Sequence, residues 1–194
     1  MTGKLIVLYG INNIGKSTQA KLLVEKLKQF GKNASYIKYP IYDLGPSGTL
    51  INEYLRQGNP WQLSAREAQI LYSLNRYQYQ AELNQRLNNG EWIVAEDYTG
   101  TGMAWGSGAG VDLDFLEKVN QGLREPDLIL WLDGQRFTSG IESGHKHEND
   151  DELINKVRQC HQFLANKYNW LKFEANQAID DLNNQLWQEV AKIL

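Results

Sequence analysis

The feature that most constrains this chain is a glycine-rich loop between an apolar run and a stretch of helical period. Residues 10–18 read GINNIGKST and match the pattern G-x-x-x-x-G-K-[ST], directly after the apolar run at residues 4–9 (KLIVLY). Glycines let such a loop wrap closely around phosphates with its N–H groups pointing inward, and the following helix N-terminus adds partial positive charge. A chance match is expected in roughly one chain of this length in a hundred. The loop therefore predicts a nucleoside triphosphate site.

The side chains of this phosphate-binding loop (P-loop) suggest separate roles toward the triphosphate. Lys16 is expected to reach the β- and γ-phosphates, and the Ser17 hydroxyl is expected to ligate Mg²⁺. The alternative is a glycine-rich turn with a chance lysine, which the placement between strand and helix disfavours. The other residues expected to hold the nucleotide here are Gly10, Asn12, Asn13, Ile14, Gly15 and Thr18.

Composition and charge are those of an ordinary globular protein. The 194 residues are 42% hydrophobic and 22% charged, which excludes a disordered chain, a collagen-like repeat and a disulfide scaffold. A net charge of −3 disfavours a nucleic-acid binder that relies on bulk charge. Cys160 is the single cysteine, and no apolar run approaches the length of a membrane span. We expect one cytoplasmic domain over residues 1–194, with neither nucleic acid nor membrane as partner.

Strand-like and helix-like stretches alternate along the chain. Ser64-Ala-Arg-Glu67 forms a capping box that opens a long helix, and residues 16–30 place Leu22, Leu23, Leu27 and Phe30 on one side. This alternation predicts a three-layer α/β/α fold with a roughly five-stranded parallel sheet, whose ligand site lies beyond the carboxyl ends of the strands. The expected strands are residues 4–9, 35–38, 91–95, 127–132 and 170–173, and the expected helices are 16–30, 64–87, 112–123, 150–168 and 179–193.

The P-loop alone does not separate a kinase from a GTPase or a motor. The Asn-Lys-x-Asp motif by which a GTPase reads its base is absent from the sequence, and the chain is too short for most ATPase motor domains. The remaining class is a small kinase that phosphorylates a nucleotide or a nucleoside.

Five segments, taken in order and spacing, resemble the thymidylate kinase family. They are residues 10–19 (GINNIGKSTQ), 69–76 (QILYSLNR), 92–105 (WIVAEDYTGTGMAW), 124–133 (REPDLILWLD) and 168–182. The resemblance implies an ATP-dependent kinase that uses Mg²⁺ and transfers the γ-phosphoryl group of ATP to dTMP, giving dTDP. It also implies a homodimer.

The resemblance assigns roles to particular side chains of the acceptor and adenine sites. It implies that Tyr72 stacks on thymine, that Arg76 hydrogen-bonds the base and that Trp105 lies beside the 2′ position of the sugar. Each also has a plain structural alternative: a core aromatic, a solvated helix residue and simple packing. The residues implied near the acceptor are Tyr39, Pro40, Tyr42, Asp97 and Thr101, with Lys38 a weaker candidate, and those over adenine are Gln177 and Ala178.

Three positions depart from the family pattern. Tyr9 stands where the family usually has glutamate, and Asn12 where it commonly has aspartate. The third strand usually ends in Asp-Arg-Tyr, whose aspartate orders Mg²⁺ and whose arginine grips the acceptor phosphate, but this chain reads Glu96-Asp97-Tyr98. Glu96 can replace the aspartate, whereas a carboxylate at Asp97 repels a phosphate. Either another cation compensates, or Asp97 points away, or the acceptor is not a phosphate monoester.

The last possibility defines a rival function. A nucleoside kinase phosphorylates a neutral 5′-hydroxyl, whose proton needs a base, and Glu96 or Asp97 could accept it. The length and the carboxyl-terminal segment favour a nucleotide kinase instead. A third alternative, motivated by Asn12 and Asp97, is a degenerate nucleotide-binding module without turnover.

Residues 134–149 (GQRFTSGIESGHKHEN) are expected to form a lid over ATP. Transfer of a phosphoryl group needs positive charge on its equatorial oxygens, and the P-loop contains no arginine. Arg136 is the first candidate for this charge and Lys146 the second, against the alternative of an exposed polar loop. His145, His147, Cys160 and His161 match no usual zinc spacing, so we expect no zinc site.

Overall fold

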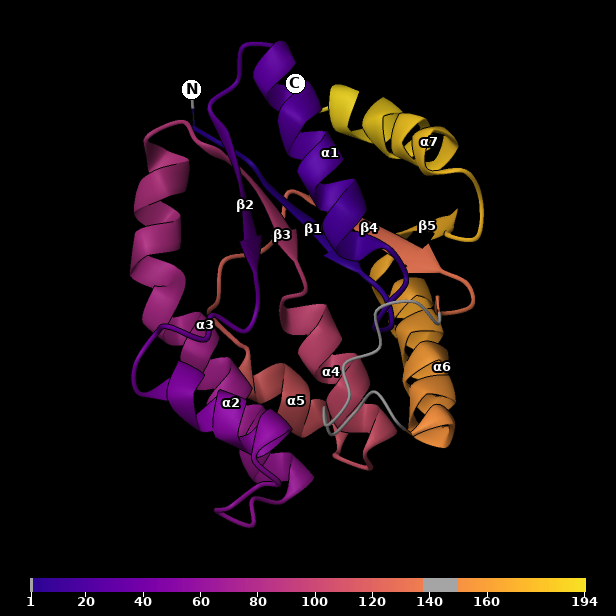
Figure 1. Ribbon diagram of the computed structural model, residues 1–194. Coiled ribbons are helices and arrows are strands. Elements are labelled where there is room, and N and C mark those ends of the chain that lie inside the picture. The colour runs from indigo at the N-terminus through magenta and orange to yellow at the C-terminus, as the bar shows by residue number, and fades with distance from the viewer. Residues whose placement is uncertain (1, 138–149) are drawn as a thin grey trace.

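A parallel five-stranded sheet organises the molecule. The computed structural model describes residues 2–137 and 150–194, and its sheet has the order β2-β3-β1-β4-β5 with every neighbouring pair parallel (Figure 1). The predicted α/β fold class is confirmed. The strands are β1 (Leu5–Tyr9), β2 (Ala34–Lys38), β3 (Trp92–Glu96), β4 (Leu128–Asp133) and β5 (Leu171–Glu174).

Helices cover both faces of this sheet. α1 and α7 pack together on one face, and α4 and α6 pack together on the other (Figure 1). Within the described residues, no helix is long and apolar enough to cross a membrane. The helices are α1 (Lys16–Gln29), α2 (Ser47–Arg56), α3 (Ala65–Asn88), α4 (Thr99–Gly108), α5 (Leu113–Val119), α6 (Asp151–Tyr168) and α7 (Ile179–Ala191).

The two central strands are buried along their whole length. Every residue of β1 and β3 is buried, as expected for a parallel sheet covered on both faces, where strands read as continuous apolar runs. Leu8 of β1 lies opposite Glu96 of β3, so the P-loop that follows β1 and the acidic pair that ends β3 meet at one edge. β3 and β2 lie on one side of β1 in the sheet, and β4 and β5 lie on its other side. The pocket described below lies at this edge, where a doubly wound sheet binds its ligands.

Local sequence signals set the ends of several helices. Ser64 Oγ accepts a hydrogen bond from the Glu67 backbone N–H, and the Glu67 carboxylate accepts one from the Ser64 backbone N–H, which confirms the predicted capping box. Asp150 and Asp112 cap α6 and α5 without a reciprocal bond: each carboxylate accepts a hydrogen bond from a backbone N–H of the first turn.

Two helices, α2 and α4, have no counterpart among the expected elements. The sequence of α4, TGTGMAWGSG, has four glycines, which disfavour a helix in isolation. Close packing explains it: a Cβ built on Gly108 would lie 2.7 Å from a side-chain carbon of Val157 in α6. Tertiary contacts that only glycine permits therefore override the local propensity of this segment.

Two further expectations are corrected. The helix expected over residues 112–123 ends at Val119, and Gly122 adopts a positive φ of 89° shortly after it. Phe30 does not join Leu23 and Leu27 in the core, because it follows the end of α1 and is 61% exposed. Its ring instead lies against Trp187 of α7, with 4.9 Å between ring centroids.

His161 of α6 is buried away from water. Its ring Nδ1 hydrogen-bonds the carbonyl oxygen of Val157, and its Nε2 has no partner among the described residues. Burial lowers the pKa of His161 to about 3, and the positive charge of Lys16 acts in the same direction. The folded protein therefore holds this ring neutral at pH values where the unfolded chain protonates it.

A neutral buried histidine should make the protein sensitive to acid. The stabilising contribution is complete above the unfolded-state pKa near 6.5 and is lost as the pH falls from there toward 3. At pH 5.0 the loss amounts to about 2 kcal/mol relative to pH 7.5. Urea unfolding of wild type and His161→Leu at both pH values should show a smaller pH dependence in the variant by that amount. An identical pH dependence in the two proteins would contradict this assignment.

Candidate active site

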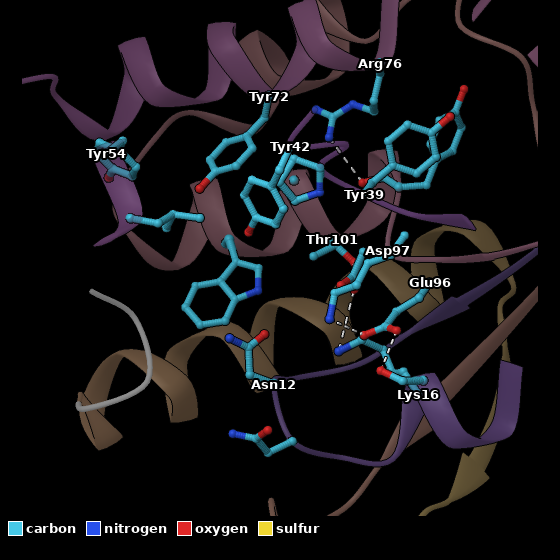
Figure 2. Close-up of a pocket in the computed structure, with 18 of the residues that line it drawn as sticks. Asn12, Lys16, Tyr39, Tyr42, Tyr54, Tyr72, Arg76, Glu96, Asp97 and Thr101 are labelled. Carbon is cyan, nitrogen blue, oxygen red and sulfur yellow. Dashed lines mark hydrogen bonds and ion pairs between the residues drawn. The ribbon is translucent and has the colours of Figure 1, made fainter. Parts of the chain in front are cut away.

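A large cavity opens beyond the carboxyl ends of β1, β2 and β3. Its volume is about 610 Å³, and its walls come from the P-loop, the ends of β2 and β3, and one face each of α2, α3 and α4. Figure 2 shows Tyr54, Tyr72 and Tyr42 at one end and Asn12 and Lys16 at the other. The predicted site residues that line it are Asn12, Asn13, Gly15, Lys16, Ser17, Thr18, Lys38, Tyr39, Pro40, Tyr42, Tyr72, Arg76, Glu96, Asp97, Thr101 and Trp105.

Several other predicted residues lie outside the walls of this cavity. Ile14 is buried, and Gly10 contributes its carbonyl oxygen to Lys16. Gln177 and Ala178 precede α7, where Gln177 donates to the Glu174 carbonyl oxygen. Arg136 donates to the Asp151 carboxylate at 2.5 Å. Lys146, His145, His147 and most of the expected lid lie outside the described residues.

The P-loop turns sharply into α1. Gly15 adopts the left-handed conformation with a φ of 95°, and the helix begins at the next residue, Lys16. The Lys16 ammonium group is buried and donates to the carbonyl oxygens of Gly10 at 3.0 Å and Ile11 at 2.8 Å. This lysine is therefore held inside the loop, at the end of the cavity that the P-loop forms.

Three polar groups contact Glu96 at the end of β3. Its carboxylate accepts hydrogen bonds from Ser17 Oγ at 2.6 Å and the Tyr36 hydroxyl at 2.5 Å, and it pairs with Lys38 Nζ at 3.0 Å. Burial alone would raise the pKa of Glu96, but Lys16, Lys38 and these hydrogen bonds outweigh it and hold the pKa below its ordinary value. Glu96 is therefore a carboxylate at neutral pH.

Asp97 faces the cavity. It has a positive φ of 63°, accepts a hydrogen bond from Thr101 Oγ1 at 2.8 Å and lies 3.6 Å from Lys16 Nζ (Figure 2). Burial raises the pKa of Asp97, Lys16 opposes the rise and the charge of Glu96 adds to it. The possibility that Asp97 points away from the site is therefore wrong. Two acids stand side by side here, and the lysines at 16 and 38 offset their charge.

The oxygen donors of Ser17 and Glu96 fit a magnesium ion. A hydroxyl oxygen and a carboxylate oxygen 2.6 Å apart are hard ligands beside the phosphate loop, and Mg²⁺ is bound in proteins by one or two such groups together with waters and substrate phosphates. Across residues 2–137 and 150–194, no three His, Cys, Asp or Glu side chains gather to hold a metal. A site made of one carboxylate, one hydroxyl and phosphates requires no such group.

Arg76 is fixed at the opposite end of the cavity. The side chain is buried, with its Nε donating to Asn120 Oδ1 at 3.0 Å, Nη1 to the Tyr98 carbonyl oxygen and Nη2 to Ser73 Oγ. The solvated-helix alternative is therefore wrong. Burial lowers the pKa of Arg76 to about 10, so the guanidinium stays charged at neutral pH.

Aromatic rings line the cavity next to Arg76. Tyr72 lies on the same face of α3 as Arg76, one turn before it. Its ring packs edge-on against the ring of Tyr54 in α2, with 6.5 Å between the ring centroids. Trp105 of α4 lines the cavity as well. Rings around a donor-only cation suit a flat heterocycle that carries hydrogen-bond acceptors.

The departure at Tyr9 has a structural explanation. Its hydroxyl accepts a hydrogen bond from the Gly100 backbone N–H at 3.0 Å, and its ring packs against Trp170 with 4.5 Å between centroids. Tyr9 therefore anchors the start of α4 rather than facing the cavity.

Sequence reasoning missed several residues of the site. Gln69 could have been found, since it precedes Tyr72 by three residues and so shares its helical face. Tyr36 and Asn120 act through Glu96 and Arg76, and nothing in their local sequence indicates this. The other missed lining residues include Tyr54, Leu55, Arg56, Ala65, Tyr98, Gly102, Ala109 and Phe137.

Comparisons with known proteins agree with this geometry. The family model described as thymidylate kinase matches residues 8–186. A thymidylate kinase of Plasmodium falciparum is 31% identical, with 98% of this chain and 91% of that protein covered, and the human thymidylate kinase is 28% identical, with 95% and 88% covered. The solved thymidylate kinase structure from Candida albicans superposes with a TM-score of 0.85 at 28% identity, covering 98% of this chain and 92% of its own.

Proposed function

The chain belongs to the thymidylate kinase family, and from this membership and the cavity we propose that it transfers the γ-phosphoryl group of ATP to dTMP, giving dTDP. One observation carries the proposal: the P-loop lysine and the base-reading pair Tyr72 and Arg76 line opposite ends of one cavity. A donor phosphate at Lys16 and an acceptor nucleotide in front of Arg76 would then face each other across the carboxyl ends of the strands. The family consists of ATP-dependent phosphotransferases.

At the donor end, the P-loop binds the triphosphate. Lys16 exchanges its hydrogen bonds to the Gly10 and Ile11 carbonyl oxygens for phosphate oxygens when ATP enters. The loop amides and the α1 N-terminus add positive potential. Gln177 and Ala178 lie over the adenine ring, and Gln19, which donates to the Ile179 carbonyl oxygen, ties their segment to α1.

Ser17 and Glu96 form the proposed magnesium site. The Ser17 hydroxyl and the Glu96 carboxylate are the groups that would hold the ion, beside the phosphate loop. Bound there, Mg²⁺ would supply positive charge to the phosphates during transfer. Tyr36 and Lys38 keep Glu96 ionised and fix its position.

The acceptor end compensates for Asp97 with cations from other elements. Lys16, Lys38, Arg56 and Arg76 line the cavity against the two acids Glu96 and Asp97. The Arg56 guanidinium lies over the Tyr42 ring, 4.7 Å from its centroid, in the segment that follows Tyr39-Pro40. We assign to Arg56 and Lys38 the attraction for the acceptor phosphate that the family obtains from the arginine after its strand-end aspartate.

Arg136 is our candidate for charge on the transferred phosphoryl group. It follows β4 directly, and Phe137 beside it hydrogen-bonds the Asn13 carbonyl oxygen through its backbone N–H at 2.8 Å. This contact brings the segment against the P-loop. Arg136 would exchange its present partner Asp151 for phosphate oxygens during transfer.

Asp97 also supports a second candidate function. A buried carboxylate with a raised pKa that lines the cavity beside Lys16 is suited to take the proton of a nucleoside 5′-hydroxyl. A nucleotide acceptor needs no such base, because its phosphate is already an anion. The two functions differ in one measurable property, which is turnover of dTMP or of thymidine.

We also propose one domain over residues 1–194 and a homodimer through α3. Ile70, Leu74 and Tyr77 fall on one face of α3 at helical spacing, and each is between 39% and 49% exposed. A row of large apolar side chains on one helix is typical of an interface.

Replacement of Lys16 tests the proposed ATP site. Lys16→Ala should lower kcat/KM for ATP about 100- to 1000-fold, because the variant loses the charge that holds the β- and γ-phosphates. ADP release with dTMP as acceptor measures this. Lys28→Ala, an exposed lysine at the end of the same helix, is the control and should keep full activity. A Lys16→Ala protein that binds and uses ATP normally would refute the donor site.

Replacement of Asp97 distinguishes a nucleotide acceptor from a nucleoside acceptor. Asp97→Asn keeps the positive φ and the Thr101 contact but removes a negative charge, so the KM for dTMP should fall about tenfold. Under the nucleoside hypothesis the same variant loses its base, and turnover of thymidine collapses. Wild type and variant are assayed with dTMP, dUMP, dCMP, dGMP, thymidine and deoxycytidine. Asp43→Asn, at an exposed acid of the neighbouring loop, should change nothing.

The interface prediction concerns molecular mass in solution. Leu74→Glu places a charge in the centre of the α3 row, so the mass measured by light scattering should fall from that of a dimer to that of a monomer. Phe163→Glu, which changes a 58% exposed ring on α6, should leave the dimer intact. A monomeric wild type rules the interface out.

A further inference from the structure

Gln69 of α3 carries a buried carbonyl oxygen in the wall of the cavity. Its side chain is only 5% exposed, it lines the cavity from α3, and its Oε1 has no hydrogen-bond partner in the described part of the chain. Buried carbonyl oxygens without a partner are rare, because desolvation without a hydrogen bond destabilises the fold. An unused acceptor in the wall of a binding cavity indicates a donor on the ligand.

The unused oxygen lies next to Arg76. A Cβ built on Gly102 would lie 2.9 Å from Arg76 Nη2 and 3.3 Å from Gln69 Oε1, so both groups border the same glycine of α4. Among the described residues Oε1 makes no hydrogen bond, to Arg76 or to any other group, so it remains available to a ligand. Acceptor and donor therefore stand side by side at one place in the cavity wall.

Arg76 keeps donors for a ligand in this arrangement. A guanidinium has five N–H groups, and among the described residues three of them bond to Asn120, Tyr98 and Ser73. Those three bonds hold the plane of the group, and both Nη atoms border Gly102. Arg76 cannot accept a hydrogen bond in any orientation.

We propose that Gln69 is a specificity-determining residue for the acceptor base, with Oε1 accepting the N3–H of thymine while Arg76 donates to O4. This inference rests on the proposed function and deepens it. Thymine and uracil present an acceptor at position 4 next to a donor at position 3, which complements the Arg76 and Gln69 pair. Cytosine presents an amino donor at position 4 and an acceptor at position 3, so it meets a like group at both.

The test compares Gln69→Met, which keeps the length of the side chain and removes its hydrogen bonding, with wild type. The value of kcat/KM should fall about 10- to 100-fold for dTMP and dUMP and should not fall for dCMP. An N3-methyl analogue of dTMP gives a second readout. For wild type, kcat/KM should be about 10- to 100-fold lower with the analogue than with dTMP. For the variant, which has no acceptor to leave unpaired, the two values of kcat/KM should differ less than threefold.

Gln78→Met is the matched control. Gln78 lies on the same helix, and its buried Oε1 also has no partner within residues 2–137 and 150–194. Its Nε2 donates to the Gly45 carbonyl oxygen away from the cavity walls. This variant should keep the wild-type ratio of dTMP to dCMP. An unchanged ratio in Gln69→Met, with the N3-methyl analogue still rejected, overturns the assignment of Gln69.

Failure of this inference is distinguishable from failure of the proposed function. Wild-type protein without dTMP turnover overturns the proposed function alone. Calorimetric affinities for thymidine, N3-methylthymidine and deoxycytidine then test the same base contact in wild type and Gln69→Met. Equal loss of affinity for all three in the variant would show a structural role, because a base-reading role lowers only the affinity for thymidine.

Discussion

The charge cluster of Lys16, Glu96 and Asp97 is the interaction on which the rest of the site depends. Lys16 is buried and would be unstable without neutralising partners, and the parallel register that sets Leu8 opposite Glu96 brings those partners to it. The strand order is therefore a requirement of the chemistry. A loop after β1 and an acid after β3 can share one phosphate site only when β1 and β3 are neighbours.

The same cluster explains how the chain accommodates Asp97 at the position where its family usually has a phosphate-binding arginine. Lys16 and Thr101 already compensate for the Asp97 carboxylate, and Lys38 for Glu96. In the function proposed above, attraction for the acceptor anion then comes from Arg56 of α2 and from Lys38, which Glu96 shares. The acceptor phosphate would thus be held from α2 and the end of β2 rather than from the end of β3.

The sequence predicts those parts of the protein whose cause is local. The P-loop, the buried strands and the Ser64 cap each follow from a few adjacent residues, and the structure contains all of them. α4 could not be predicted, because its glycines disfavour a helix until α6 packs against them. The support of Arg76 by Asn120 joins residues 44 positions apart. Such contacts exist only after folding, so a single sequence does not indicate them.

The glycines of α4 also connect fold stability with selectivity. At Gly102 the absence of a side chain leaves room for Arg76 and Gln69 to meet at the cavity wall, and any larger residue would occupy that space. The cost is an amide oxygen that is buried with no hydrogen-bond partner among the residues that the structure describes. A fully satisfied wall would be more stable in the empty protein and would hold no acceptor for a base. The arrangement therefore trades stability of the empty pocket for recognition of its ligand, a balance that is typical of preorganised binding sites.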